Sequence, residues 1–218
     1  MLRARRNPPS NVFPADPWGL GAVHFDTDLF LGYVGQAETM FALSNGYLGI
    51  RGTMDEGQPI EEPGTYLNGF YETRPITYGE SAYGFPDSGQ SMLTCPDGTL
   101  MRLTIDDEPF DLARAEVLEF SRRLDLARGV LTRNVTWRTA RGRRFTLRTT
   151  RLVSLVMKHI AAIDWELVPD DDVDLVISSE LIERAPLPVQ EFDPRLAEAP
   201  DRSVLCRTGA SADGCAQY

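Results

Sequence analysis

The sequence predicts an all-β protein built mainly from antiparallel strands. Apolar and polar residues alternate with period two in several segments, polar turns recur between them, and no long segment follows the helical period. The chain has 218 residues, of which 42% are hydrophobic, so it can form one large β domain with a buried core. Short strands separated by polar turns at intervals near ten residues are typical of an antiparallel sandwich.

Composition divides the chain into three parts. Residues 1–17 are rich in Pro and Arg, and we expect a flexible N-terminal arm. We expect residues 18–183 to form the β-sandwich, although glycine, proline and aromatic residues predict irregular structure from Trp18 to about Gly98. Residues 184–218 have no strand pattern towards their end, so we expect an irregular or truncated tail and a sandwich that lacks its last strands.

A glycine-rich segment, FALSNGYLGIRGTMDEG, covers residues 41–57. Its Asn45-Gly46 pair predicts a hairpin turn, because both residue types tolerate a positive φ. Gly49 and Gly52 leave one face of the return strand without side chains, which allows a bend, a bulge or a close neighbour. The glycine spacing and the lack of a following Gly-Lys-Ser/Thr argue against a nucleotide-phosphate loop. We therefore expect this segment to pack closely against another layer of protein.

Strand patterns become regular after Gly98. Expected strands cover residues 99–105, 110–112, 117–126, 130–139, 157–167 and 173–181. In the fifth of these, the side chains of Met157, His159, Ala161, Ile163, Trp165 and Leu167 share one face. The acidic residues Asp106, Asp107 and Glu108, and likewise Asp170 to Asp172, are assigned to turns and not to acid–base chemistry.

The remaining residues with catalytic or ligating chemistry are few. The two histidines, His24 and His159, are distant in sequence, and we expect His159 to be a core histidine on the apolar face of its strand. No G-x-S-x-G motif is present. The three cysteines, Cys95, Cys206 and Cys215, follow no metal-binding spacing, so we expect no metal site and free thiols in a reducing cytoplasm.

Charge and hydropathy limit the partners. The net charge of −10 argues against nucleic acid, which requires a basic surface. The N-terminus has no secretory signal, and no run of 18 apolar residues exists, so we expect no contact with a membrane and a cytoplasmic location.

Two segments have unusual compositions. Between Arg114 and Arg151 there are eleven arginines against three acids, which indicates either the solvated outer face of a sheet or a docking face for an acidic partner domain. Six aromatic residues, Tyr66, Phe70, Tyr71, Tyr78, Tyr83 and Phe85, lie close together in sequence. Aromatic rings beside Asn and Glu suit sugar binding, and the alternative is an insertion that buries these rings against protein.

Five blocks in order make the sequence similar to a known family. They are ETMFALSNGYLGIRGTMDEG, PGTYLNGFYETRPITYGESAYGFP, DGTLMRLTIDDEPFDL, RRLDLARGVLTRNVTWRT and RLVSLVMKHIAAIDWEL. They resemble the N-terminal domain of glycoside hydrolase family 65, which includes maltose, trehalose, kojibiose and nigerose phosphorylases and a few hydrolases. The resemblance covers residues 18–183 and implies a large sandwich of the super-sandwich, galactose-mutarotase-like type.

The resemblance also implies a reaction and partners for the longer protein. In this family an (α/α)6 barrel carries a glutamate acid that protonates the glycosidic oxygen, while phosphate attacks the anomeric carbon with inversion. No organic cofactor or metal is implied. The implied partners are an α-glucosyl disaccharide such as maltose, trehalose or kojibiose, inorganic phosphate, the catalytic barrel domain and a second copy in a homodimer.

We therefore expect this chain to be a non-catalytic N-terminal portion, with the barrel absent and no catalytic residue. The expected contact site, at the domain interface or the rim of the substrate cleft, comprises Tyr66, Asn68, Phe70, Tyr71 and Glu72. The alternatives are a self-standing carbohydrate-binding β-sandwich and an unrelated β-sandwich hydrolase.

Overall fold

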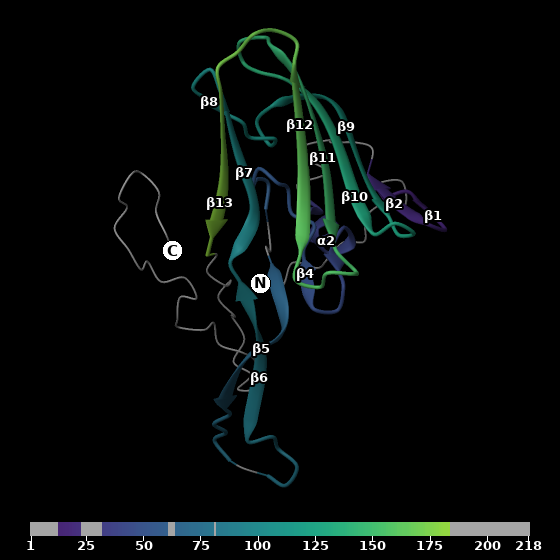
Figure 1. Cartoon of the computed structure of the whole chain (residues 1–218). Helices are drawn as coiled ribbons and strands as arrows, with labels where there is room; N and C mark the ends of the chain where they lie inside the picture. The colour runs from purple at the N-terminus through teal and green to yellow at the C-terminus, as the bar shows by residue number, and fades with distance from the viewer. Residues whose placement is uncertain (1–12, 23–31, 61–63, 81, 184–218) are drawn as a thin grey trace.

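The computed structural model describes residues 13–22, 32–60, 64–80 and 82–183. These residues form antiparallel sheets and one short helix, so the expected all-β antiparallel fold is confirmed (Figure 1). No helix in the described part of the chain is long and apolar enough to cross a membrane.

The largest sheet has six strands in the order β1-β2-β9-β10-β11-β12. Its strands are β1 (Ala15–Asp16), β2 (Gly19–Ala22), β9 (Glu116–Asp125), β10 (Val130–Arg138), β11 (Arg144–Val153) and β12 (Ala161–Pro169). β10 pairs along its length with β9 on one side and β11 on the other, so these three strands form the centre of the sheet.

Two smaller sheets and the helix complete the described fold. A three-stranded sheet has the order β13-β7-β8, and a four-stranded sheet has the order β3-β4-β5-β6. The remaining elements are α2 (Val34–Met40), β3 (Leu43–Ser44), β4 (Leu48–Ile50), β5 (Thr65–Pro75), β6 (Ser88–Cys95), β7 (Asp97–Ile105), β8 (Glu108–Pro109) and β13 (Leu175–Ile182). Figure 1 shows β5 and β6 extending away from the other strands as a two-stranded ribbon.

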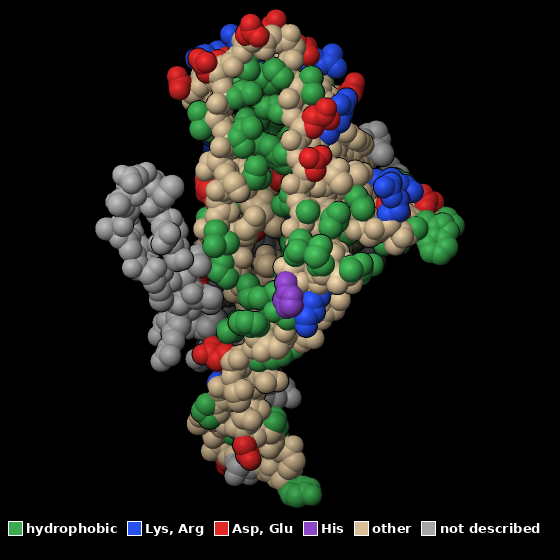
Figure 2. All heavy atoms as spheres, in the orientation of Figure 1, with side chains coloured by type: hydrophobic (Ala, Val, Ile, Leu, Met, Phe, Trp, Pro, Cys, Tyr) green, Lys and Arg blue, Asp and Glu red, His purple; other side chains and the backbone are tan. Residues whose placement is uncertain are grey.

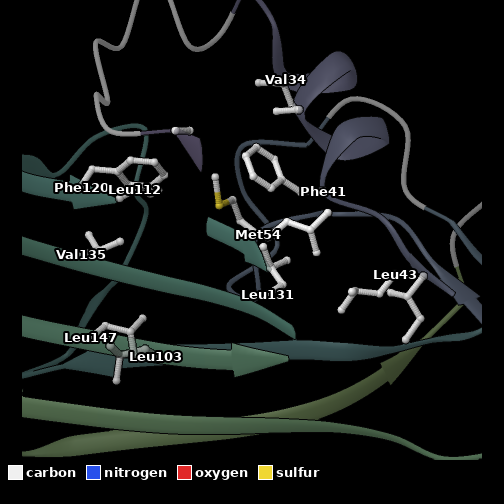
Figure 3. Packing of buried hydrophobic residues seen from close by; sticks show 14 of the residues in the cluster. Val34, Phe41, Leu43, Met54, Leu103, Leu112, Phe120, Leu131, Val135 and Leu147 are labelled. Carbon is white, nitrogen blue, oxygen red and sulfur yellow. The ribbon is translucent and has the colours of Figure 1, made fainter. Parts of the chain in front are cut away.

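The core lies on one face of the six-stranded sheet. Alternation along β9, β10 and β11 places Phe120, Val135 and Leu147 on this inner face, where all three are buried. Residues from outside the sheet pack against them, including Phe41 after α2 and Met54 (Figure 3). Burial of each side chain of this size stabilises the fold by about 1.5–3 kcal/mol.

The predicted Asn45-Gly46 hairpin is present between β3 and β4. Gly46 has a φ of +86°, but Asn45 is not among the residues with positive φ. The Asn45 side chain instead accepts hydrogen bonds from the backbone N–H groups of Tyr47 and Leu48, at 3.0 and 2.8 Å. The turn therefore forms through a side-chain cap as well as through the freedom of glycine.

Two strand expectations were wrong in detail. The segment 110–112 is not a strand; β8 ends before it, and Leu112 enters the core as part of a turn. β12 begins at Ala161 and not at Met157, because Ser154 to Ile160 form the turn after β11. The backbone N–H of Ser154 donates to the carbonyl of Ile160 at 2.9 Å and closes this turn.

The expectation of irregular structure between residues 18 and 98 was also wrong for the strands β5 and β6, although residues 51–60 are irregular as expected. β5 and β6 are long strands, with 11 and 8 residues. Most of β5 is exposed, so its residues need no apolar alternation. Its pairing with β6 also shifts register between Tyr66 and Tyr71, which further obscures the strand pattern.

Candidate functional site

The ribbon formed by β5, β6 and the residues between them carries the predicted contact site, and we call residues 65–95 the arm. Four aromatic side chains of the arm are strongly exposed: Phe70, Tyr71, Tyr83 and Phe85. Tyr83 is fully exposed, and Figure 2 shows an isolated hydrophobic group at the tip of the ribbon. In the described structure these rings are therefore not buried against their own domain.

A bulge in β5 fixes the geometry of the arm near its base. Four residues, 67–70, lie between positions paired with Thr94 and Met92, and Gly69 in this bulge has a φ of +97°. The Asn68 backbone N–H donates to the carbonyl of Tyr47 at 2.8 Å, and its side-chain amide donates to the carbonyl of Gly46 at 3.2 Å. Asn68 thus ties the bulge to the β3–β4 hairpin.

The five predicted contact residues have different environments. The Tyr71 hydroxyl donates to Oδ1 of Asn68 at 3.0 Å, so these two side chains are brought together. Phe70, the last residue of the bulge, and Glu72, on the strand beyond it, are exposed. Tyr66 is partly buried, and its ring lies over the backbone of Gly64, where an added Cβ would come within 2.3 Å of it. Four of the five are therefore exposed to solvent, whereas Tyr66 is partly buried near the base of the arm.

The sequence did not reveal a second cluster, which lies in the core. Three arginines on the inner face of the large sheet, Arg122, Arg133 and Arg151, are buried against the segment 52–56. We call these arginines with Asp55 and Glu56 the arginine clamp. Arg122 and Arg133 lie opposite each other on β9 and β10. The Arg-rich segment is thus neither wholly a solvated face nor a docking face, because three of its members hold an internal segment.

The contacts of the clamp are specific. Both terminal nitrogens of Arg133 donate to the carboxylate of Glu56, at 2.9 and 2.7 Å. Arg151 donates to the carboxylate of Asp55. Arg122 donates to the carbonyl of Gly52 at 2.7 Å, and its guanidinium carbon lies 4.7 Å from the centre of the Phe41 ring.

The charges of the clamp shift one another's pKa values. Burial alone would raise the pKa of Asp55, but the charges of Arg151 and Arg133 outweigh it and hold this pKa below its usual value. For Arg133, burial opposes the charges of Glu56 and Asp55, which together raise its pKa. Burial, and then the charges of Arg151 and Arg133, lower the pKa of Arg122 to about 9.

Close packing against the backbone of Phe41 explains one glycine of the segment 41–57. The Gly52 backbone N–H donates to the carbonyl of Glu38 at 2.7 Å, and a Cβ at Gly52 would lie 2.8 Å from the carbonyl oxygen of Phe41. Gly52 therefore allows close contact between two backbone segments, as the sequence predicted. At Gly49 the nearest atom would be at 3.6 Å, so only one of the two glycines is required by close packing.

The other candidate residues do not form a catalytic arrangement. His159 is exposed, and its ring lies edge-on to Tyr47 with centroids 4.7 Å apart, so the expectation of a core histidine was wrong. His159 belongs to the turn before β12, where side chains no longer alternate between the two faces of a sheet. Asp106 and Asp107 form the β7–β8 turn with positive φ, as expected of turn residues.

Some sequence expectations concern residues that are not described. His24, Cys206 and Cys215 lie outside the described residues, and Cys95 is a free thiol whose pKa is raised by burial. Among the described residues, no three His, Cys, Asp or Glu side chains come together as a metal site.

Comparison with known proteins identifies the family. The model of the N-terminal domain of glycosyl hydrolase family 65 matches residues 26–217 of this chain. The chain belongs to glycosyl hydrolase family 65. The match continues beyond residue 183, so the family region extends further than the sequence blocks alone indicated.

The similar proteins are much longer than this chain. An uncharacterized glycosyl hydrolase of Mycobacterium tuberculosis is 41% identical over 195 residues, which cover 89% of the chain and 24% of that protein. An α,α-trehalose phosphorylase of Thermoanaerobacter brockii is 37% identical over 162 residues, which cover 72% of the chain and 20% of that protein. A solved structure described as a candidate kojibiose phosphorylase from the human microbiome superimposes with a TM-score of 0.67 at 27% identity. The match covers 77% of the chain and 22% of that structure.

The family 65 match therefore establishes the fold and the domain of this chain. Sequence reasoning found the arm residues through their composition, but it did not find the clamp. Arg122, Arg133 and Arg151 are separated by 11 and 18 positions, and only the strand register brings them to one face.

Proposed function

We propose that this chain is the N-terminal β domain of an inverting phosphorylase that cleaves α-glucosyl disaccharides. Support comes from the family 65 match and from the similarity to a trehalose phosphorylase and to kojibiose phosphorylases. The relatives extend far beyond the matched region, because the chain spans only about a fifth to a quarter of their length. In this proposal the residues that protonate the sugar and bind phosphate lie in that further part.

The observation that carries a role for this domain is the exposure of the arm. Phe70 is 50% exposed and Tyr71 is 39% exposed, on a ribbon that extends away from the sheets. The base of this hairpin is held by hydrogen bonds, so its exposed aromatic rings can make apolar contacts with another domain at a distance from the sheets. We propose that Phe70, Tyr71, Asn68 and Glu72, supported by Tyr66, contact the catalytic domain at the rim of its substrate cleft.

The chemistry at the rim fits either protein or sugar as the contacted group. Phe70 supplies an apolar face, and Glu72 is an exposed hydrogen-bond acceptor. The Tyr71 hydroxyl and the Asn68 amide already form a hydrogen-bonded pair, so their orientation is set before any partner binds. Preorganised groups of this kind lower the entropic cost of association.

A turnover assay tests the proposed function. The protein that joins this domain to the further part found in its relatives is incubated with trehalose, kojibiose, maltose or nigerose, with and without phosphate. The proposal predicts glucose 1-phosphate only when phosphate is present. Release of free glucose at the same rate without phosphate would indicate a hydrolase instead.

Variants of the arm test its role separately. Phe70→Ser with Tyr71→Ser is expected to raise KM or lower kcat, whereas Trp18→Ser, which removes another exposed aromatic side chain on the β1–β2 turn, is expected to leave both unchanged. Equal kinetics for all three proteins would contradict a contact between the arm and the cleft.

The second candidate function is a self-standing carbohydrate-binding module. The same exposed rings favour it, because aromatic faces stack on sugar rings. It predicts that the isolated chain binds disaccharides through Phe70 and Tyr71, so that their substitution abolishes binding.

A further inference from the structure

An open cleft lies at the end of the sheets away from the arm. Its volume is about 720 Å³, within the range of about 300–1,000 Å³ that small-molecule sites occupy. Its walls come from β8, the segment 110–116 and the turn between β10 and β11. In the described part of the chain the cleft is open to solvent at its outer end, and its inner end reaches Glu56 of the arginine clamp.

Aromatic side chains form a rigid apolar wall of the cleft. Phe110 is partly exposed, and its ring centre lies 4.2 Å from that of Trp137. Trp137 is buried and stacks on Phe145 at 5.4 Å, within the hydrophobic core. Phe110 therefore presents one face to the cleft while the core fixes its position.

The charged groups of the cleft leave little net charge. Its lining includes three arginines and four acids, of which Glu56 is paired with Arg133 outside the lining: Arg102, Arg114, Arg138, Glu56, Glu108, Asp111 and Glu116. Arg138 pairs with Glu116 at 3.0 Å, and Arg114 pairs with Asp111 at 3.4 Å. Exposed pairs of this kind are weak, so they can exchange partners for ligand hydroxyls at little cost. At the inner end, the carboxylate of Glu56 is already neutralised by Arg133.

This composition selects the class of ligand. A phosphorylated ligand would require an excess of positive charge, and a cationic ligand would require an excess of negative charge. A cleft without a large excess of either charge, with arginines and carboxylates beside one aromatic face, suits a neutral, hydroxyl-rich ring, because its C–H face can stack while its hydroxyls bind the charged groups. We propose that this cleft binds a neutral sugar of monosaccharide to disaccharide size.

The proposal does not rest on phosphorylase activity, because the cleft lies entirely within this domain. Binding is measured by isothermal titration of the 218-residue chain with glucose, maltose, trehalose and kojibiose. Saturable binding of at least one of these sugars is expected. Phe110→Ala should weaken it about tenfold through loss of the stacking face. Arg114→Gln should weaken it severalfold with no effect on folding, because this side chain is 88% exposed.

Controls separate this cleft from the arm and from charge effects. Arg128→Gln, which lies outside the cleft lining, should leave affinity unchanged, and Phe70→Ser with Tyr71→Ser shows whether the sugar binds at the arm instead. The proposal is overturned if no sugar binds, if inorganic phosphate or glucose 6-phosphate binds more tightly than the neutral sugars, or if only the arm variant loses binding. Should Phe110→Ala fail to fold, an unchanged affinity of Arg114→Gln would still overturn it.

Discussion

Removal of Arg133 from the arginine clamp is expected to destabilise the domain severely. Arg133→Met would leave the carboxylate of Glu56, 1% exposed at its side chain, without the two hydrogen bonds that it now accepts. Removal of one partner from such a buried pair costs about 3–5 kcal/mol. Since small domains unfold with a free energy of about 5–15 kcal/mol, the loss is a large part of the total.

Two further variants determine whether burial of the unpaired charge is the cause. Replacement of both partners, Arg133→Met with Glu56→Met, should recover most of the loss, because a buried pair exchanged for apolar groups of similar volume is nearly neutral. Arg138→Met is the matched control on the same strand. It removes a pair with Glu116 at 3.0 Å whose side chains are about half exposed, and the expected cost is about 0–1 kcal/mol.

Urea unfolding followed by tryptophan fluorescence and circular dichroism measures the free energy of unfolding of these proteins. The reasoning is refuted if Arg133→Met and Arg138→Met lose similar free energies. It is also refuted if the double variant is less stable than Arg133→Met alone, because Glu56 would then not be the group left unpaired.

Three other predictions follow from the same geometry. Gly52→Ala should lower the free energy of unfolding by about 1–3 kcal/mol because its Cβ would approach the Phe41 backbone, whereas Gly49→Ala should leave it unchanged. Equal unfolding midpoints for the two variants would contradict this prediction. The pKa of Arg122 is lowered to about 9 in the folded chain, so above this pH the unfolded chain binds more protons than the folded one. The free energy of unfolding of the wild type, relative to that of Arg122→Met, should therefore rise as pH increases beyond about 9. A decrease in this difference would contradict the prediction. The exposed rings of the arm should cause the isolated chain to self-associate, and Phe70→Ser with Tyr71→Ser should reduce light scattering; a chain that is monomeric at all concentrations would refute this.

Local patterns predicted β9, β10 and most of β12 in the large sheet, whereas β1, β2 and β11 were not among the expected strands. β9 and β10 have one face in the core, so period-two alternation in their sequences reported their structure directly. The same rule failed for Met157 and His159, because the apolar alternation continues into a turn whose side chains are exposed. Alternation alone does not tell a strand from the turn that precedes it.

The arm and the clamp show what composition and pattern omit. The arm was recognised as an aromatic segment, but its two-stranded form was missed because exposure on both faces removes the hydrophobic period. The clamp was missed because an arginine on the inner face of a strand is indistinguishable in sequence from one on the outer face. Only the register of β9, β10 and β11 determines that Arg122, Arg133 and Arg151 turn inward.

The configuration of the sugar phosphate tests the proposed function most directly. Proton NMR of the first products, recorded while the protein that contains this domain acts on trehalose or kojibiose with phosphate, distinguishes the two anomers of glucose 1-phosphate. Inversion at an α-glucosidic bond predicts β-glucose 1-phosphate as the initial product. Initial formation of the α anomer, or of free glucose without any requirement for phosphate, would contradict the assignment of this domain to an inverting phosphorylase.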